Sequence, residues 1–299
     1  MILSTRAKRW IQLVLFSICL TGTNIGTRVY ADESALPAAE AVIAPSDGVI
    51  QLFDGKTLGD CYTWLRESKR DDPRNVFGVT DGLLHITGDG YGGLVTNKAY
   101  CDYHLILEFK WGKRTWKDRE RAARDSGLLI HSNGADGGYA GIWMPSIEVQ
   151  IIEGGTGDFL IVPGKDVTGE LMPVSISVNA ARDRDGEFIW KADAPRETIA
   201  GESVRQVNWS GRDVEWENKI GFRGAHDLES PFGKWTRIDV IADGDHVQTF
   251  VNGTLANEAF DVSPRAGRLQ LQSEMAEIFF RRWELWPVGK GPAPAPAKQ

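Results

Sequence analysis

The sequence predicts an all-β protein folded as a two-sheet jelly-roll sandwich. Short segments in which apolar and polar residues alternate recur along the chain, and this period of two is typical of half-buried strands. Turn-forming residues separate these segments, and no long amphipathic helical pattern is present. Residues 47–288 contain no break in composition, and one all-β domain can fill a chain of this length. Many strands without helices favour a sandwich or a jelly roll.

The expected strands are spread over this whole domain. The clearest signal is the hairpin at residues 247–256, where Asn252-Gly253 supplies the positive φ angles of a two-residue turn between alternating strands. The strand pattern is also present at residues 82–87, 103–111, 127–131, 146–152, 174–178, 235–242, 268–272 and 278–286.

The two ends of the chain are predicted to lie outside the folded domain. Residues 1–31 have the form of a signal peptide, with a basic start, an apolar run at 10–20 and a small-residue cleavage site ending at Ala31. An uncleaved membrane anchor is the alternative, although the run is short for a membrane span. Residues 32–46 are expected to be a linker, and the Pro/Ala-rich residues 289–299 a disordered tail. We therefore expect a periplasmic or secreted protein.

Composition narrows the range of partners. The formal net charge is −7, and without residues 1–31 the chain has 30 Lys and Arg against 41 Asp and Glu, a balance of −11. Nucleic acids and anionic membranes bind basic surfaces, so neither is an expected partner. We expect a monomer. Cys61 and Cys101 are the two cysteines after residue 31; an oxidising compartment permits a disulfide between them, and two free thiols are the alternative.

Residues 146–155 are the most informative segment of the chain. Alternation places Glu148 and Gln150 on one face of a strand and three apolar residues on the other. Glu153 has the opposite parity, but one bulged residue near Ile152 would return it to the polar face. Two carboxylates with an amide between them form a plausible acid/base platform for cleaving sugars. The alternative is a solvated strand face without chemistry.

Two segments interrupt the strand pattern. Residues 113–124 form a charged loop, and residues 180–228 form a long polar excursion that carries Trp190, Trp209 and Trp216. Long loops in a compact sandwich are usually functional or mobile, and the tryptophans favour a function.

A series of short motifs runs through the whole domain. They are LFDGKTL at 52–58, YHLILEFKW at 103–111, DSGLLIH at 125–131, IEVQIIE at 147–153, GKWTRI at 233–238, VNG at 251–253, LQLQSE at 269–274 and FR at 280–281. Taken together, these motifs resemble the 3-keto-disaccharide hydrolase family, whose members adopt a concanavalin A-like lectin/glucanase sandwich. The chain departs from the family pattern at His131, where many members have Arg, at Glu153, where many have Asp, and in the long excursion at 180–228.

This resemblance implies a hydrolase that acts on sugars already oxidised to a ketone at carbon 3. The ketone acidifies the C2 proton, so a base can remove it, the C1 substituent can leave, and water can add. Glu148 is the expected base or acid, with His131 or Glu153 as its counterpart. The side chains expected to bind the sugar or complete the carboxylate cluster are Gln150, Gln272 and Glu274. The aromatic side chains expected to stack on the sugar, unless they belong to the core, are Trp116, Trp143 and Trp216.

Three other functions are compatible with the same residues. Glu148, Glu153 and His131 could bind a divalent cation, although their spacing matches no recognised metal motif and no other cofactor is expected. The segment also resembles the Glu-x-Asp-x-x-Glu strand of laminarinase-type retaining glycosidases, with Gln150 in place of the central Asp. A lectin on the same fold would bind carbohydrate without cleaving it.

Overall fold

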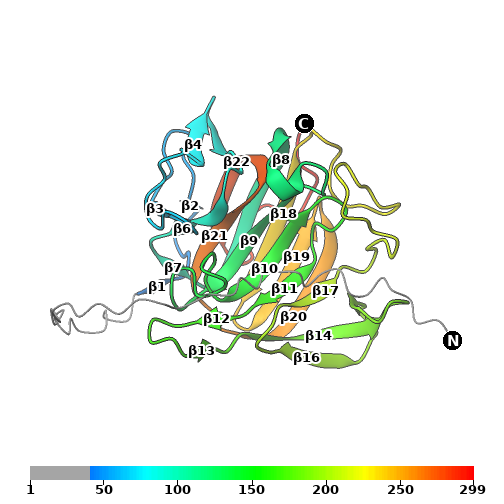
Figure 1. Ribbon diagram of the computed structural model, residues 1–299. Coiled ribbons are helices and arrows are strands. Elements are labelled where there is room, and N and C mark those ends of the chain that lie inside the picture. The colour runs from blue at the N-terminus through cyan, green and yellow to red at the C-terminus, as the bar shows by residue number, and fades with distance from the viewer. Residues whose placement is uncertain (1–40) are drawn as a thin grey trace, which may run out of the picture. The chain divides into compact units, whose positions relative to one another are not determined.

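The computed structural model describes residues 41–299, which form one unit and are built almost entirely of strands (Figure 1). In that range the helical structure is a short 3₁₀ turn, η1 (Lys117–Arg119). The prediction of an all-β sandwich is therefore confirmed. None of the helical structure in residues 41–299 is long and apolar enough to cross a membrane. The predicted signal peptide and most of the predicted linker lie outside the described residues.

One layer, which we call the front sheet, contains the strands that carry the candidate site. Its strands are antiparallel except for the last pair, which is parallel. In spatial order they are β3 (Cys61–Leu65), β6 (Tyr91–Thr96), β21 (Arg268–Glu274), β9 (Asp125–Ser132), β10 (Ser146–Ile152), β11 (Phe159–Val162), β17 (Arg205–Asn208) and β15 (Phe188–Trp190).

The back sheet packs against the front sheet and is antiparallel. Its order is β4 (Phe77–Thr80), β5 (Leu83–Ile86), β22 (Ala276–Pro287), β8 (Tyr103–Thr115), β18 (Thr236–Asp243), β19 (His246–Val251), β20 (Thr254–Ser263), β14 (Ser175–Arg182) and β16 (Arg196–Ala200).

Short strands complete the architecture. β2 (Ile50–Gln51) pairs with β22, and the far half of β14 pairs with β15, so β14 joins the two sheets at one edge. Two small ladders stand apart: β1 (Val42–Ile43) with β7 (Ala99–Tyr100), and β12 (Gly164–Lys165) with β13 (Leu171–Met172).

The hydrophobic core lies between the two sheets. On the front sheet, Ile147, Val149 and Ile151 of β10 point into it, and on the back sheet Leu105 and Leu107 of β8 do the same. The intervening residues of β10 therefore face away from the core, on what we call the outer face of the front sheet. This alternation is the one predicted from the sequence.

The predicted strands all coincide with strands of the structure, and the Asn252-Gly253 hairpin is confirmed by φ angles of 47° and 84°. Sequence analysis missed the strands of two to four residues, which contain too few alternating positions to show a period, and it also missed β3, β6 and β16, which have five or six residues. The excursion at 180–228 is more ordered than predicted, since it contains β15, β16 and β17. Cys61 and Cys101 are free thiols.

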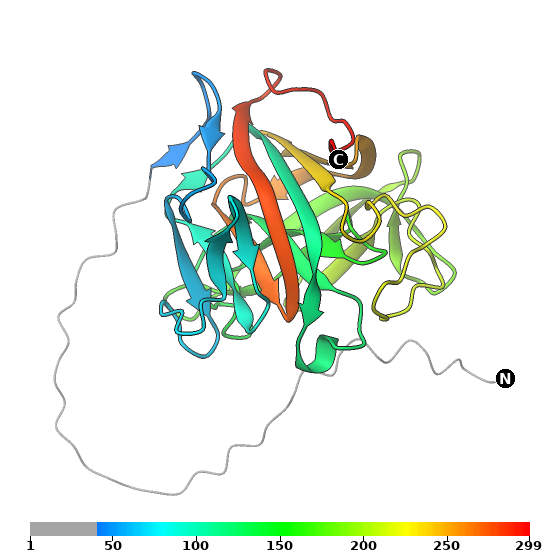
Figure 2. The same ribbon diagram turned by 90° about the horizontal axis from the view of Figure 1, so that it is seen from above.

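Two predictions about the ends of the domain are wrong. Val42–Ile43, placed in the linker by composition, forms strand β1. Residues 289–299, predicted to be disordered, turn back over the back sheet (Figure 2). Their prolines lack N–H groups but keep their carbonyls, and the buried Arg237 donates to Pro292 O and Ala293 O at 3.3 Å. Composition alone cannot reveal such acceptors for a buried cation.

We predict that deleting residues 289–299 lowers the free energy of unfolding by about 1–3 kcal/mol, because Arg237 loses two acceptors while it stays partly buried. Urea unfolding followed by circular dichroism measures this change. Lys290→Ala is the matched control, since its side chain makes a single 3.5 Å contact with Ser46 O. Unchanged stability of the truncated protein would show that the tail contributes nothing to the fold.

Candidate active site

Glu148 lies at the centre of the outer face of the front sheet. It pairs across strands with Leu129 of β9 on one side and Leu160 of β11 on the other. Only 4% of Glu148 is exposed, and no ion pair in residues 41–299 involves it. A buried carboxyl without a cation is costly when it is ionised, which makes Glu148 the first candidate for chemistry.

Gly127 makes room for the Glu148 carboxyl. A Cβ on Gly127 would collide with Glu148 Oε1 and lie 2.7 Å from Gln272 Oε1, so both side chains occupy the space above this glycine. Gln272 is 1% exposed, and neither of its amide atoms has a hydrogen-bond partner. An unpartnered buried amide beside a buried acid is a ready donor and acceptor for a bound ligand.

Two further carboxyl groups complete what we call the carboxyl cluster, which consists of Glu148, Glu274 and Asp125. Arg119 of η1 forms an ion pair with Asp125 and contacts Glu274 Oε1 at 3.1 Å. Glu274 ends β21 and Asp125 begins β9, so neighbouring strands bring them together. One arginine is thus shared by two of the three acids.

Burial and mutual repulsion raise the pKa values of this cluster. Burial first, and then the charges of Glu274 and Asp125, raise the pKa of Glu148 well above its ordinary value, while the Gln272 amide, which lies close to the carboxyl but outside hydrogen-bond geometry, opposes the shift. Burial and Asp125 raise the pKa of Glu274 to about 8 against the opposing effect of Arg119. Burial raises the pKa of Asp125 to about 6, although Arg119 lowers it. The cluster can therefore hold and transfer protons near neutral pH.

An aromatic wall borders the cluster. Tyr139 and Trp143 stack with their ring centroids 6.4 Å apart and their planes at 13°, and Tyr91 meets Trp143 edge-on. Both tyrosines and Trp143 pack around Leu129, the cross-strand neighbour of Glu148. The indole of Trp143 donates to Gly92 O at 2.9 Å. Trp143 thus lies in a buried cluster beside Leu129, and its predicted stacking on a sugar stays a prediction.

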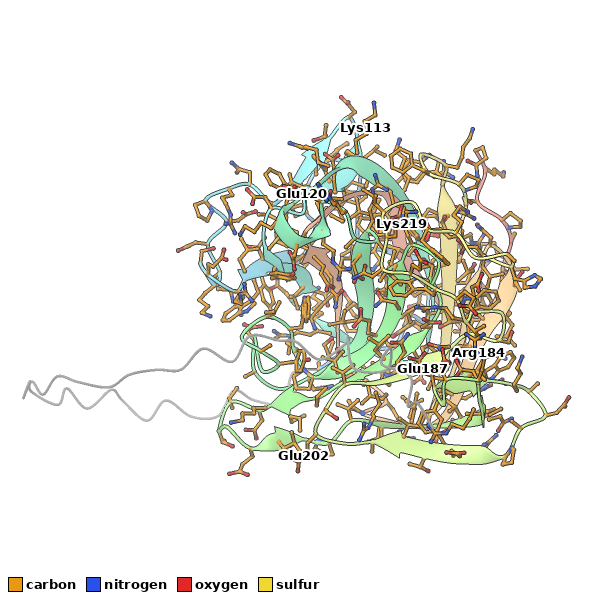
Figure 3. The ribbon with its side chains drawn as sticks, turned by 45° about the vertical axis from the view of Figure 1, so that its right-hand side comes forward. Lys113, Glu120, Arg184, Glu187, Glu202 and Lys219 are labelled. Atoms are coloured by element: carbon orange, nitrogen blue, oxygen red, sulfur yellow. The ribbon has the colours of Figure 1, made fainter. Side chains whose placement is uncertain are left out.

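Two loops meet at one end of the front sheet, near the cluster. The backbone N–H of Ile220 donates to Arg121 O at 3.0 Å, and Asn218 Oδ1 accepts from the Ala123 N–H at 3.0 Å. Figure 3 shows Glu120 of the first loop and Lys219 of the second at the same end of the domain. The charged loop at 113–124 and the end of the long excursion therefore support each other.

Three other predicted sugar-binding residues form hydrogen bonds with the backbone. Gln150 shares the outer face with Glu148, and its Oε1 accepts from the Ile151 N–H at 2.8 Å. The Trp116 indole donates to Thr87 O and the Trp216 indole to Glu153 O, both at 2.9 Å. Their contact with a sugar stays a prediction.

The structure separates Glu153 from Glu148. β10 keeps its register with β9 through the last pair, Ile152↔Asp125, so the predicted bulge near Ile152 is absent. Glu153 instead accepts from Arg124 Nη1 at 2.7 Å and from the Gly221 N–H at 2.8 Å. We therefore remove Glu153 from the predicted catalytic pair, because its carboxylate is fully engaged in holding Arg124 and the second loop.

His131 is also turned away from Glu148, although its strand lies beside β10 as predicted. Arg268 pairs with Ser132 and Gln270 with Leu129, so β9 has one extra residue at this point. His131 adopts a φ of 52° in this bulge, and its ring packs edge-on against Tyr103, 5.8 Å away. Burial lowers the pKa of His131 to about 4. No local sequence pattern indicates this bulge, which reverses the direction of the side chain.

Three residues near the site were missed by sequence analysis. Asp125 shares the parity of Gly127 on β9, so the strand pattern could have placed it on the outer face. Arg119 and Tyr139 lie in loops, and only tertiary structure brings them to the strands. Among residues 41–299, no group of three or more His, Cys, Asp or Glu side chains has a geometry that could hold a metal ion.

Comparison with known families identifies the domain. A family model described as the 3-keto-alpha-glucoside-1,2-lyase-like domain matches residues 48–285. The chain belongs to this family. Membership of the 3-keto-alpha-glucoside-1,2-lyase-like family confirms the predicted resemblance and supports a carbohydrate-active function, as a glycosidase-like enzyme or a binding protein. A search of curated proteins gave no match.

The solved structures that align with this family member share little sequence with it. A protein from Parabacteroides distasonis described as a glycosyl hydrolase aligns with a TM-score of 0.45 and 16% identity, over 81% of this chain and 94% of the other. The β-glucanase of Bacillus licheniformis gives 0.36 and 12%, over 80% and 91%. The carbohydrate-binding module CBM66 of Bacillus subtilis gives 0.39 and 9%, over 70% and 89%.

We predict that Glu148→Gln changes how stability depends on pH. The raised pKa means that folded Glu148 keeps its proton after the unfolded chain has lost it above about 4.5, so this group makes the wild type less stable as pH rises. The variant lacks this group. The difference between its melting temperature and that of the wild type should therefore shift in favour of the variant as the pH rises from 5 to 9. Parallel melting curves over this range would contradict a raised pKa.

We predict that Glu153→Gln lowers the free energy of unfolding by about 3 kcal/mol, because it leaves the charge of the buried Arg124 unpaired. The activity of the folded variant should depend on pH in the same way as that of the wild-type protein. The double variant Glu153→Gln/Arg124→Met is the matched control and should regain part of the stability. A stable Glu153→Gln protein that is inactive would return Glu153 to the chemistry.

Proposed function

We propose that this protein cleaves 3-keto-glycosides by proton abstraction at C2, elimination of the C1 substituent and addition of water. The observation that carries the proposal is the pair of Glu148, which is buried, and Glu274, which is partly buried; both have raised pKa values and belong to one cluster. Family membership supports the same substrate class. The export signal expected from the sequence would place the activity in the periplasm or outside the cell.

The reaction divides into three balanced steps. A carboxylate takes the C2 proton, and the C–H electron pair forms the C2=C3 bond of an enolate while the ketone electrons move to the C3 oxygen. The enolate then restores the ketone, its electrons form a C1=C2 bond, and the C1–O bond breaks as the leaving oxygen takes a proton from an acid. Water adds to C1 and a proton returns to C2, which completes net hydrolysis.

The cluster supplies a proton donor and a proton acceptor for these steps. Glu148, whose pKa is raised well above its ordinary value by burial and by the neighbouring acids, is the acid for the leaving oxygen. Glu274, which Arg119 contacts, becomes ionised as the pH approaches about 8 and is the base for C2. Gln272, with its free buried amide, is placed to bind a sugar oxygen.

A retaining glycosidase of the laminarinase type receives less support. That mechanism needs two carboxyls about 5–5.5 Å apart, one as nucleophile and one as acid/base. Glu153, the second carboxylate of the sequence motif, is bound by Arg124 and the Gly221 N–H. A lectin gains nothing from a carboxyl cluster that is costly to bury, since neutral amides would bind hydroxyls as well.

We predict that the purified protein cleaves a 3-keto-disaccharide and leaves the unoxidised disaccharide intact, because only the ketone acidifies the C2 proton. In D₂O the released keto sugar should carry deuterium at C2, as measured by mass spectrometry and NMR. Glu148→Gln should lower kcat by about 10²-fold or more.

Other outcomes point to the other functions. Cleavage of an unoxidised glucan with retained configuration and no deuterium at C2 indicates a retaining glycosidase. Tight binding of both sugars without turnover, with or without an added divalent cation, indicates a lectin. Glu153→Gln is the matched control, because it changes a carboxyl of the same segment that lies outside the cluster.

A further inference from the structure

We propose that Tyr139 is a third catalytic residue, whose hydroxyl donates a hydrogen bond to the C3 oxygen of the sugar as that oxygen takes up the negative charge of the enolate. This inference rests on the proposed elimination and assigns a role that neither the strand pattern nor the family motifs point to. Three properties of Tyr139 support this role: its loop is held in place, its ring packs near Glu148, and its hydroxyl stays protonated.

The loop that carries Tyr139 is held at both ends. It connects β9 to β10, the strands of Asp125 and Glu148, and the backbone of Tyr139 exchanges hydrogen bonds with that of Trp143 at 2.8 and 3.2 Å. The Lys165 N–H donates to Gly138 O at 3.1 Å, which ties the loop to β12. A residue fixed in this way can present its side chain in one orientation, as a preorganised donor requires.

The ring of Tyr139 packs against the residues that border the carboxyl cluster. It stacks on Trp143, whose indole is anchored on β6, and it packs against the group formed by Leu129, Ile142 and Trp143. Leu129 lies directly opposite Glu148 in the sheet. The partly buried Tyr139 therefore contacts the nearest cross-strand neighbour of the proposed acid.

The hydroxyl of Tyr139 lies within electrostatic reach of the two proposed proton-transfer groups. Burial first, and then the charges of Glu148 and Glu274, raise the pKa of Tyr139. A phenol in this position keeps its proton across the working pH range, so it suits hydrogen-bond donation to an oxyanion better than proton transfer to a leaving group. Proton transfer falls to the carboxyl of Glu148.

The other groups around the cluster leave this donor role open. The guanidinium of Arg119 is engaged by Asp125 and Glu274, and the hydroxyl of Tyr91 donates to Asp118 Oδ2 at 3.0 Å. The amide of Gln272 is free and can supply a second hydrogen bond. Two neutral donors facing an enolate oxygen in a buried site stabilise its charge without requiring reorganisation.

The test uses a series of 3-keto-glycosides whose phenolic leaving groups range from phenol to 4-nitrophenol. We expect Tyr139→Phe, which keeps the stacked ring, to lower kcat by about 10²-fold with little change in KM. Deuterium incorporation at C2 should slow by the same factor, because enolate formation is the step affected. The loss in kcat caused by Tyr139→Phe should stay constant along the series. The loss in kcat caused by Glu148→Gln should become smaller as the leaving group needs less protonation.

Two further variants keep the result interpretable. Tyr103→Phe is the matched control, since Tyr103 is fully buried in the core and its hydroxyl has no hydrogen-bond partner, so its kinetics should equal those of the wild type. Tyr139→Leu removes the hydroxyl and the ring together, and should reproduce the loss in kcat with an added rise in KM. Melting temperatures identify any variant that fails to fold.

Three results would overturn the inference. The first is a kcat for Tyr139→Phe within threefold of the wild type, and the second is a change confined to KM, which would limit Tyr139 to binding. The third is a deficit that shrinks with better leaving groups, which would place the hydroxyl at the leaving oxygen. In each case a wild type active on the keto sugars leaves the proposed function standing; a wild type inactive on all of them overturns both.

Discussion

The candidate site depends on a carboxyl group buried without a cation. Glu148 can occupy its position because Gly127, on the neighbouring strand, has no side chain where the carboxyl lies. Apolar neighbours on both sides of Glu148 and the loops over the sheet keep water and cations away, so the neutral acid is favoured. Ionised Glu148 would have to be compensated from elsewhere, because Arg119 is already shared by the two other acids of the cluster. Proton exchange within the cluster follows from this shortage of cations.

The same strand segment carries a second carboxylate, Glu153, that is paired with a cation, whereas Glu148, within the described part of the chain, is not. This contrast is why we assign the proposed function to Glu148. Glu153, five residues after Glu148, has an arginine of its own together with backbone N–H donors. Successive residues of the neighbouring chain segment serve the two acids: Arg124 binds Glu153, whereas Asp125 joins the carboxyl cluster. Side chains of successive residues in a strand point in opposite directions. Arg124 therefore points toward Glu153, whereas Asp125 points toward the carboxyl cluster.

Sequence alone predicted the features that depend on local patterns. Alternation in β10 correctly placed Glu148 and Gln150 opposite the apolar residues, and Asn252-Gly253 correctly predicted a hairpin turn. Features that depend on pairing between distant segments were beyond its reach. The bulge that turns His131 toward Tyr103 arises where β9 meets β21, more than 130 residues later in the chain. The partners of Glu153 and the tail contacts of Arg237 likewise come from segments with no periodic signal of their own.

The cluster lies where the chain passes from one sheet to the other, and this junction explains how loop residues reach it. β21 ends at Glu274 in the front sheet and β22 begins at Ala276 in the back sheet, so Met275 alone makes the crossing, with a φ of 59°. The carbonyl of Met275 accepts from the Trp116 N–H at 2.9 Å, and the Trp116 carbonyl accepts from the Arg119 N–H at 2.9 Å. The backbone that fixes Glu274 thus also fixes the turn carrying Arg119. Because acid and arginine share one support, their contact does not rely on the flexible side chains alone, and the charge balance of the cluster is built into the connection between the sheets.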